Sequence, residues 1–175
     1  AVDYACGAGH FLTEYAAQIK PFVLQYKGDN LADYYAQIYG IEKEYRLSKV
    51  AKVSAFMYGQ EGIQIFYNDA LSQKVSIEDN SFSVLIANPP YSVKGFLETL
   101  TEGEREAFEL FNKDINIDTF NSIETFFIER AKQLLCAEGI AAIVLPASVL
   151  TNGNIYIKCR EILLKHFDIV AIAEM

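Results

Sequence analysis

The fold class is indicated first by residues 1–19, AVDYACGAGHFLTEYAAQI. This stretch opens with a short apolar run, which is typical of a buried strand, and continues into a turn that contains two glycines. Apolar side chains then recur at the spacing of a helix, and Pro21 follows shortly after them. Because proline removes a helical hydrogen bond, we predict a strand over residues 1–5, a turn over residues 6–9 and a helix that ends at Pro21.

The rest of the chain repeats this alternation of strand and helix. We predict further strands over residues 37–41, 63–67, 81–87, 140–145 and 169–173, and further helices over residues 44–58, 122–138 and 155–166. The strand over residues 140–145 has the strongest apolar pattern, so we expect it to be buried. Short apolar strands separated by helices are typical of a parallel sheet with helices on both faces. The sequence therefore predicts a doubly wound, mostly parallel α/β fold.

Three finer expectations concern the helices and the long connection between them. The helix over residues 44–58 is expected to bury one face, made of Leu47, Val50, Ala51, Ser54 and Met57. Asn121 is a candidate helix N-cap, because Glu124 follows three residues later as in a capping box. Residues 92–120 show only a weak pattern, so we expect a long mobile connection there.

Composition and charge limit the class of protein. The chain has 175 residues, of which 51% are hydrophobic and 22% charged, so we expect one folded domain over residues 1–175. Its net charge of -8 argues against a module that binds nucleic acid by itself, but not against a catalytic module whose DNA contacts come from another segment. The three cysteines form no CxxC pair and the histidines number two, so we predict neither a disulfide framework nor a metal site. No apolar run is long enough for a membrane helix.

Two carboxylates and the glycine turn follow predicted strands, at the edge where parallel sheets bind ligands. Glu42 is suited to bind the two ribose hydroxyls of a nucleoside-type cofactor, or it is a solvated side chain near a helix N-terminus. Asp69 can accept a hydrogen bond from an adenine amino group, or it caps a turn. The turn lacks the third glycine of the dinucleotide motif, with Leu12 in its place, which argues against a nicotinamide cofactor.

The sequence Asn88-Pro89-Pro90-Tyr91 follows the predicted strand over residues 81–87 and is the most specific motif in the chain. Two consecutive prolines remove two backbone donors and restrict the residue before each of them. The Asn88 side-chain oxygen and the Pro89 carbonyl can then accept hydrogen bonds from one amino group. Tyr91 offers a flat ring on which a planar base can stack, which contributes about 1–3 kcal/mol. The motif therefore favours a site for an amino group on a planar base over a purely structural proline turn.

In this context the motif resembles the catalytic motif of amino-group S-adenosylmethionine-dependent methyltransferases. Residues 3–12, DYACGAGHFL, resemble the D-x-A-C-G-x-G-x-F-L cofactor motif of DNA adenine-N6 methyltransferases. Residues 40–44 and 68–71, GIEKE and NDAL, resemble the second and third cofactor motifs of that family, and residues 126–146 resemble its next helix and strand. The likeness is greatest to the modification (M) subunits of type I restriction-modification systems and their fused relatives, and it covers nearly the whole chain.

The resemblance implies a Rossmann-like methyltransferase that uses S-adenosyl-L-methionine, without a metal, to methylate N6 of adenine in DNA. It implies cofactor contacts from Asp3, Ala5, Cys6, Gly7, Gly9, Phe11, Glu42, Asp69 and Asn88. The catalytic residues that it implies are Asn88, Pro89, Pro90 and Tyr91, with Tyr91 stacked on an adenine flipped out of the duplex. Cys6 is expected to be a small packed residue rather than a nucleophile.

The resemblance also implies a cytoplasmic protein that acts on DNA with a specificity subunit or a fused target-recognition domain. The chain starts inside its first predicted strand and lacks an initial methionine, so we expect it to be a fragment truncated at both ends. Parts of the family pattern are missing upstream and downstream. We therefore expect this fragment alone to bind the cofactor more weakly than the parent protein and not to methylate DNA.

Three other interpretations stay open on the residues alone. Methyltransferases that act on a protein glutamine or on an RNA base can carry the same Asn-Pro-Pro-Tyr sequence, although the form of the glycine motif favours DNA. A non-catalytic scaffold subunit of a restriction complex is disfavoured by the intact motif together with Glu42 and Asp69. A nicotinamide oxidoreductase is disfavoured by the missing third glycine and by the two prolines.

Overall fold

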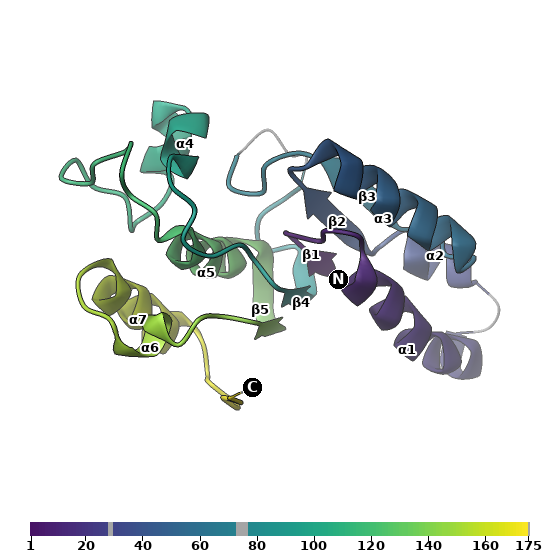
Figure 1. The fold of residues 1–175 in the computed structure, drawn as a ribbon. Coiled ribbons are helices and arrows are strands. Elements are labelled where there is room, and N and C mark those ends of the chain that lie inside the picture. Colours follow the sequence, from purple (N-terminus) through teal and green to yellow (C-terminus); the bar gives the residue numbers. More distant parts are fainter. Residues whose placement is uncertain (28–29, 73–76, 175) are drawn as a thin grey trace. The chain divides into compact units, whose positions relative to one another are not determined.

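The computed structural model describes residues 1–27, 30–72 and 77–174, and Figure 1 shows their elements in chain order. The strands are β1 (Val2–Asp3), β2 (Tyr39–Glu42), β3 (Gln64–Tyr67), β4 (Phe82–Ala87) and β5 (Leu135–Ile143). The helices are α1 (His10–Lys27), α2 (Leu31–Tyr35), α3 (Tyr45–Met57), the 3-10 helix η1 (Phe96–Thr99), α4 (Glu102–Glu106), α5 (Ile123–Leu134), α6 (Ser148–Thr151) and α7 (Ile155–His166). They belong to two compact units, residues 1–89 with 134–144, and residues 90–133 with 145–174.

The first unit contains a five-stranded parallel sheet in the order β3-β2-β1-β4-β5. The short strand β1 lies in the middle, where Val2 pairs with Tyr39 of β2 on one side and with Leu85 of β4 on the other. The strand order reverses between β1 and β4, which makes this position the topological switch point of the sheet. The predicted doubly wound, parallel α/β fold is therefore confirmed.

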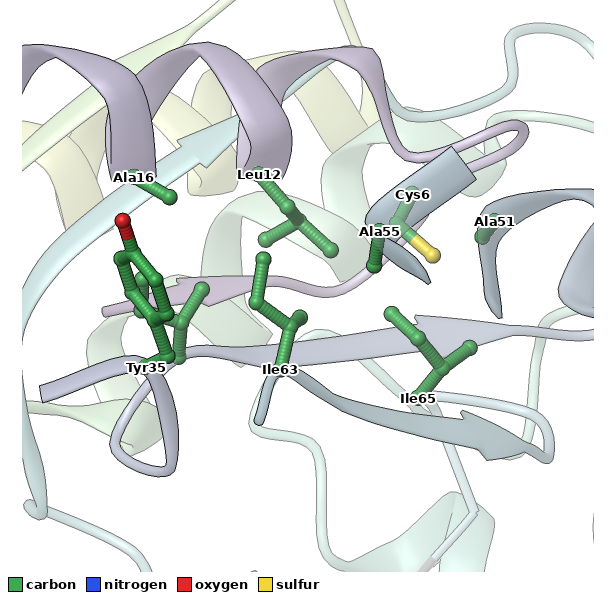
Figure 2. Packing of buried hydrophobic residues seen from close by; sticks show 9 residues of the cluster. Cys6, Leu12, Ala16, Tyr35, Ala51, Ala55, Ile63 and Ile65 are labelled. Carbon is green, nitrogen blue, oxygen red and sulfur yellow. The ribbon is translucent and has the colours of Figure 1, made fainter. Parts of the chain in front are cut away.

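A hydrophobic core of the first unit lies where α1, α2 and α3 pack against the sheet. Figure 2 shows its members: Cys6, Leu12, Ala16, Tyr35, Ile38, Ala51, Ala55, Ile63 and Ile65. Gly40 of β2 leaves room for this packing, because a Cβ atom there would lie 2.6 Å from Leu12 Cδ1. Helix α1 thus rests directly on the strand backbone, and this close contact positions the turn between β1 and α1.

The second unit is organised around the apolar side of α5. The Phe126 ring contacts Phe96, Phe108 and Phe120, with ring centroids 5.2–5.9 Å apart. Helix α4 in the segment over residues 92–120 begins with a capping box between Thr101 and Glu104. This segment is the predicted long connection with some helix, and its phenylalanines supply much of the core of the unit. Its mobility stays a prediction.

Two predictions about helices are wrong in detail. Helix α1 continues through Pro21 to Lys27. The proline removes one backbone hydrogen bond from the helix, and burial of the Val23 side chain beyond it offsets this loss. Of the predicted face of helix α3, Ala51 is buried and Ser54 is half-buried, but Leu47, Val50 and Met57 are exposed. The other buried residues of the helix are Ser48 and Ala55. Small side chains let the helix approach the sheet closely, and the buried Ser48 hydroxyl is satisfied by a hydrogen bond to the Tyr45 carbonyl, 2.8 Å long.

The end of the chain also differs from the prediction. Strand β5 starts at Leu135, directly after α5, so the last residues of the helix predicted over residues 122–138 belong to this strand instead. This strand lies at the edge of the sheet that the structure describes, so Ile140 is exposed rather than buried. Residues 169–173 were predicted to form a strand, but they pair with no strand in the described part of the chain. A strand needs a neighbour for its backbone hydrogen bonds, and Val170 is 89% exposed here.

The predicted capping box at Asn121 is absent as well. Helix α5 begins at Ile123, and the carboxylate of Glu124 accepts hydrogen bonds from Ser92 and Tyr156 instead of from the backbone of Asn121. Local sequence spacing suggested a cap, but contacts with distant segments determine where this side chain lies.

Candidate functional site

The carboxyl edge of the sheet collects most of the predicted site residues. The turn over residues 6–9 follows β1, Glu42 is the last residue of β2, Asp69 follows β3 and Asn88 follows β4. Because the strands are parallel, all four positions lie at the same edge, as the strand pattern predicted. This edge of the first unit is the candidate site.

The glycine turn has a backbone that favours glycine at two positions. Gly7 has φ of +53° and Gly9 has φ of +84°, and the Gly9 N–H donates to the Cys6 carbonyl over 2.7 Å. A Cβ atom on Gly9 would lie 3.1 Å from Cβ of Ala51, so this glycine allows the turn to approach α3. A Cβ atom on Gly7 would meet nothing within 4 Å. Gly7 therefore borders open space at the sheet edge.

Glu42 connects this turn to the start of α3. Its Oε2 atom accepts a hydrogen bond from the Gly7 N–H (2.8 Å), and its Oε1 atom accepts one from the Glu44 N–H (2.7 Å). A carboxylate has about four lone-pair sites, so both oxygens retain capacity for a further donor. Glu42 is therefore held in place at the edge rather than loosely solvated, and it can still accept hydrogen bonds from ligand hydroxyls.

Asp3 places a second carboxylate beside the same turn. Its side chain is buried, and its Oδ1 atom accepts a hydrogen bond from the Ala5 N–H over 3.0 Å. The pKa of Asp3 is raised to about 7, mainly by burial and to a smaller extent by the negative charge of Glu42, while the Ala5 hydrogen bond lowers it. Two acidic groups thus adjoin the turn, and one of them is costly to ionise unless a positive charge comes close.

Cys6 belongs to the core rather than to the reactive surface of the turn. It is buried in the cluster of Figure 2, and the pKa of its thiol is raised strongly by burial and then by the charges of Asp3 and Glu42. A thiol in this environment stays protonated near neutral pH and is a poor nucleophile. This agrees with the expectation that Cys6 is a packed residue. Phe11 is the second residue of α1 and is exposed.

Asp69 already has partners in this structure. Its Oδ1 atom accepts a hydrogen bond from the Leu71 N–H (3.0 Å), which is the turn-capping role that the sequence left open. Its Oδ2 atom lies 2.6 Å from Nζ of Lys43. Sequence reasoning missed Lys43, because its loop and the loop of Asp69 meet only in the folded sheet. A ligand amino group at Asp69 would share the carboxylate with Lys43 or displace Lys43 from it.

The Asn-Pro-Pro-Tyr motif extends across the boundary between the two units. Asn88 and Pro89 directly follow β4 and belong to the first unit. Just before them, the Ala87 carbonyl accepts a hydrogen bond from the Val144 N–H. The Asn88 side chain is exposed and Pro89 is buried. Tyr91 belongs to the second unit and is 37% exposed, and its pKa is raised by partial burial and by the nearby charge of Glu124.

Across residues 1–27, 30–72 and 77–174, no three His, Cys, Asp or Glu side chains gather as a metal site. Within the same described ranges, no helix has the length and apolar character that crossing a membrane requires.

The sequence matches the family model of the N-6 DNA Methylase family over residues 1–175. It is 24% identical to the methylase subunit of the type I restriction enzyme EcoEI from Escherichia coli, over 99% of this chain and 33% of that protein. The methyltransferase subunit of the type I restriction-modification system from Streptococcus thermophilus has a similar fold, with a TM-score of 0.65 and 23% identity over 94% of this chain and 33% of that one.

A similar fold also occurs in a protein from Listeria monocytogenes that is assigned to the class I S-adenosylmethionine-dependent methyltransferases. The TM-score is 0.69 at 19% identity, over 94% of this chain and 44% of that one. These structural likenesses show the fold. The chain spans about a third of the length of the EcoEI subunit, so the activity of a whole protein does not follow from this match alone.

Proposed function

Because this chain belongs to the N-6 DNA Methylase family, we propose that it is the catalytic part of an enzyme that transfers a methyl group from S-adenosyl-L-methionine to N6 of adenine in DNA. The observation that carries the proposal is the position of Asn88-Pro89, directly after β4 and at the same sheet edge as the glycine turn, Glu42 and Asp69. Binding groups for a nucleoside-type cofactor and acceptors for an amino group thus belong to one edge.

The residues at this edge fit a cofactor that carries positive charge and a nucleoside. Asp3 and Glu42 adjoin the turn, and a positive charge beside them would lower the free-energy cost of ionising the buried Asp3. The open space at Gly7 allows close approach to the backbone. Glu42 retains lone pairs for ribose hydroxyls, and Asp69 provides an acceptor for an adenine amino group after its lysine is shared or displaced.

The cofactor, when bound, supplies an activated methyl group. In our proposal the chain then contributes mainly position and electrostatics, which can lower a reaction barrier by roughly 7–11 kcal/mol. The Asn88 side-chain oxygen and the Pro89 carbonyl accept the two hydrogens of the adenine amino group and so orient its lone pair. Tyr91 stacks on the base after it leaves the duplex, because N6 is not accessible for attack within the paired stack.

Family membership and the charge of the chain support our proposal for the substrate and the partners. Family membership favours DNA over a protein glutamine or an RNA base as the substrate. The net charge of -8 is unsuited to holding duplex DNA, so we propose that a specificity subunit or a fused target-recognition domain supplies most of the DNA contacts.

The direct test is to compare adenine methylation across the host genome with and without the full-length gene. We expect N6-methyladenine at one recognition sequence to disappear in the deletion strain and to return on complementation. Methylation that is unchanged in the deletion strain would overturn the proposal, and it would favour a scaffold role or another substrate.

The sharper test is Asn88→Ala in the full-length protein. Removing an acceptor that orients the amino group weakens the transition state more than it weakens cofactor binding. We expect methylation to be abolished while the affinity for S-adenosylmethionine, measured by calorimetry, stays within a few-fold of the wild type. Loss of cofactor affinity with turnover retained would show that Asn88 has a different role.

A further inference from the structure

We propose that Glu124 is a positioning residue that holds the backbone directly after Tyr91 in the conformation needed for methyl transfer. The inference deepens the proposed function and rests on it, because Tyr91 is the last residue of the Asn-Pro-Pro-Tyr motif. All side chains and backbone atoms used below lie in the second unit, so the inference depends only on contacts within that unit.

The first observation is the backbone of Ser92. Its φ is +54°, in the left-handed region that residues other than glycine rarely adopt. The Ser92 N–H donates a hydrogen bond to Oε2 of Glu124 over 3.1 Å. A left-handed backbone at such a residue persists only where the surroundings hold it. The Glu124 carboxylate is the group that holds the N–H of this residue.

The second observation is how firmly Glu124 itself is held. It is 1% exposed and lies in the first turn of α5, where the free N–H groups of a helix stabilise a negative charge. Its Oε1 atom accepts a hydrogen bond from the Tyr156 hydroxyl of α7 over 2.5 Å. Glu124 therefore connects the motif to α5 and α7.

These contacts have a direct consequence for Tyr91. Tyr91 is 37% exposed, and its backbone is bonded directly to Ser92. The φ angle of Ser92 sets the direction in which the chain leaves Tyr91. Without Glu124, Ser92 can relax toward an ordinary negative φ, and the Tyr91 ring then loses its fixed direction. Cofactor-binding residues of the first unit are not part of this set of contacts.

The chain contains a matched control on the same helix. Glu129 is also 1% exposed, and its carboxylate accepts hydrogen bonds from the N–H groups of Glu109 (2.5 Å) and Leu110 (3.0 Å). Like Glu124 it fixes backbone of the segment over residues 92–120, but it does so 18 residues or more beyond the motif. Loss of Glu129 should therefore cost stability without changing the position of Tyr91.

The kinetic experiment compares Glu124→Ala, Glu124→Gln and Glu129→Ala in the full-length protein with its partners, at a temperature where all are folded. We expect Glu124→Ala to lower kcat at least tenfold while KM for S-adenosylmethionine stays within threefold. Glu129→Ala should keep kcat within twofold. Glu124→Gln should restore most of the rate, because its amide oxygen can still accept the Ser92 N–H while its NH2 group faces the Tyr156 oxygen.

A second measurement does not depend on activity. Hydrogen exchange of the same proteins should be faster over residues 88–96 in Glu124→Ala, and over residues 107–112 in Glu129→Ala. Equal losses of kcat in the two alanine variants, or unchanged exchange over residues 88–96 in Glu124→Ala, would overturn the inference. A wild-type protein that transfers no methyl group would overturn the proposed function instead, and the exchange data would still decide the role of Glu124.

Discussion

At the residue scale, Asp3 combines burial with negative neighbours in a way that affects both stability and binding. It is 2% exposed, and its pKa of about 7 in the folded chain lies well above the ordinary value of 3.8. The folded state therefore binds a proton at Asp3 more tightly than the unfolded state does. Stability from protonated Asp3 is fully present below about pH 3.8, and it is lost as the pH rises through about 7.

Asp3→Asn tests this linkage, because asparagine has a similar shape and cannot ionise. The variant should gain stability relative to the wild type as the pH rises from about 4 to 7, and the difference should level off above that range. Each pH unit between the two pKa values corresponds to about 1.4 kcal/mol, so the gain is at most about 4 kcal/mol. Urea unfolding at several pH values measures it. Parallel stability curves for the two proteins would contradict the raised pKa.

At the scale of elements, α3 has apolar residues on several sides, and the size of the side chains decides which side is buried. Periodicity predicted a face with three large side chains beside Ala51 and Ser54, but the structure buries only small ones, Ser48, Ala51 and Ala55. The glycine turn approaches this face closely, because a Cβ atom on Gly9 would lie only 3.1 Å from Cβ of Ala51. A larger side chain on this face would hold the helix away from the sheet and loosen the turn.

A pair of substitutions on α3 tests this assignment. Ala55→Leu adds volume to a closely packed site and should destabilise the chain by about 1–3 kcal/mol. Met57→Gln changes a side chain that is 78% exposed, so its effect should stay within about 0.5 kcal/mol. Chemical unfolding of both variants gives the two values. A large cost for Met57→Gln with none for Ala55→Leu would instead support the face that periodicity suggested.

At the scale of the whole molecule, charge limits what this chain can bind alone. Its 15 basic residues are outnumbered by 23 acidic ones, and the net charge of -8 repels phosphate. Arg46, Lys49 and Lys52 lie on α3, but the Lys49 ammonium rests over the Tyr45 ring, 5.2 Å from its centroid. Three such charges release few counterions, so they contribute little to affinity for DNA.

We therefore expect the chain over residues 1–175 to bind duplex DNA weakly if at all. A gel-shift titration at moderate salt should show no complex at sub-micromolar protein, whereas the full-length protein with its specificity component should form one. Sub-micromolar binding by this chain alone would show that its own surface carries the DNA contacts.

Much of the architecture could be predicted from local patterns. Strand and helix alternation predicted the parallel sheet, and the position of Glu42, Asp69 and Asn88 at strand ends predicted their common edge. These features depend on periodicity of 2 or 3.6 residues and on glycine and proline, whose effects are local. The contact of Glu42 with the Gly7 N–H and the ion pair of Lys43 with Asp69 could not be predicted, because each joins loops that meet only after folding.

The sequence by itself determined the α/β class, the order of the motifs along the chain and the chemistry available at the sheet edge. Only the tertiary structure decided which face of α3 is buried, that residues 169–173 pair with no described strand, and that Glu124 holds Ser92 instead of capping α5. The physical reason is the same in each case. Burial and hydrogen bonding between distant segments outweigh local preferences of a few tenths of a kcal/mol to about 1 kcal/mol per residue.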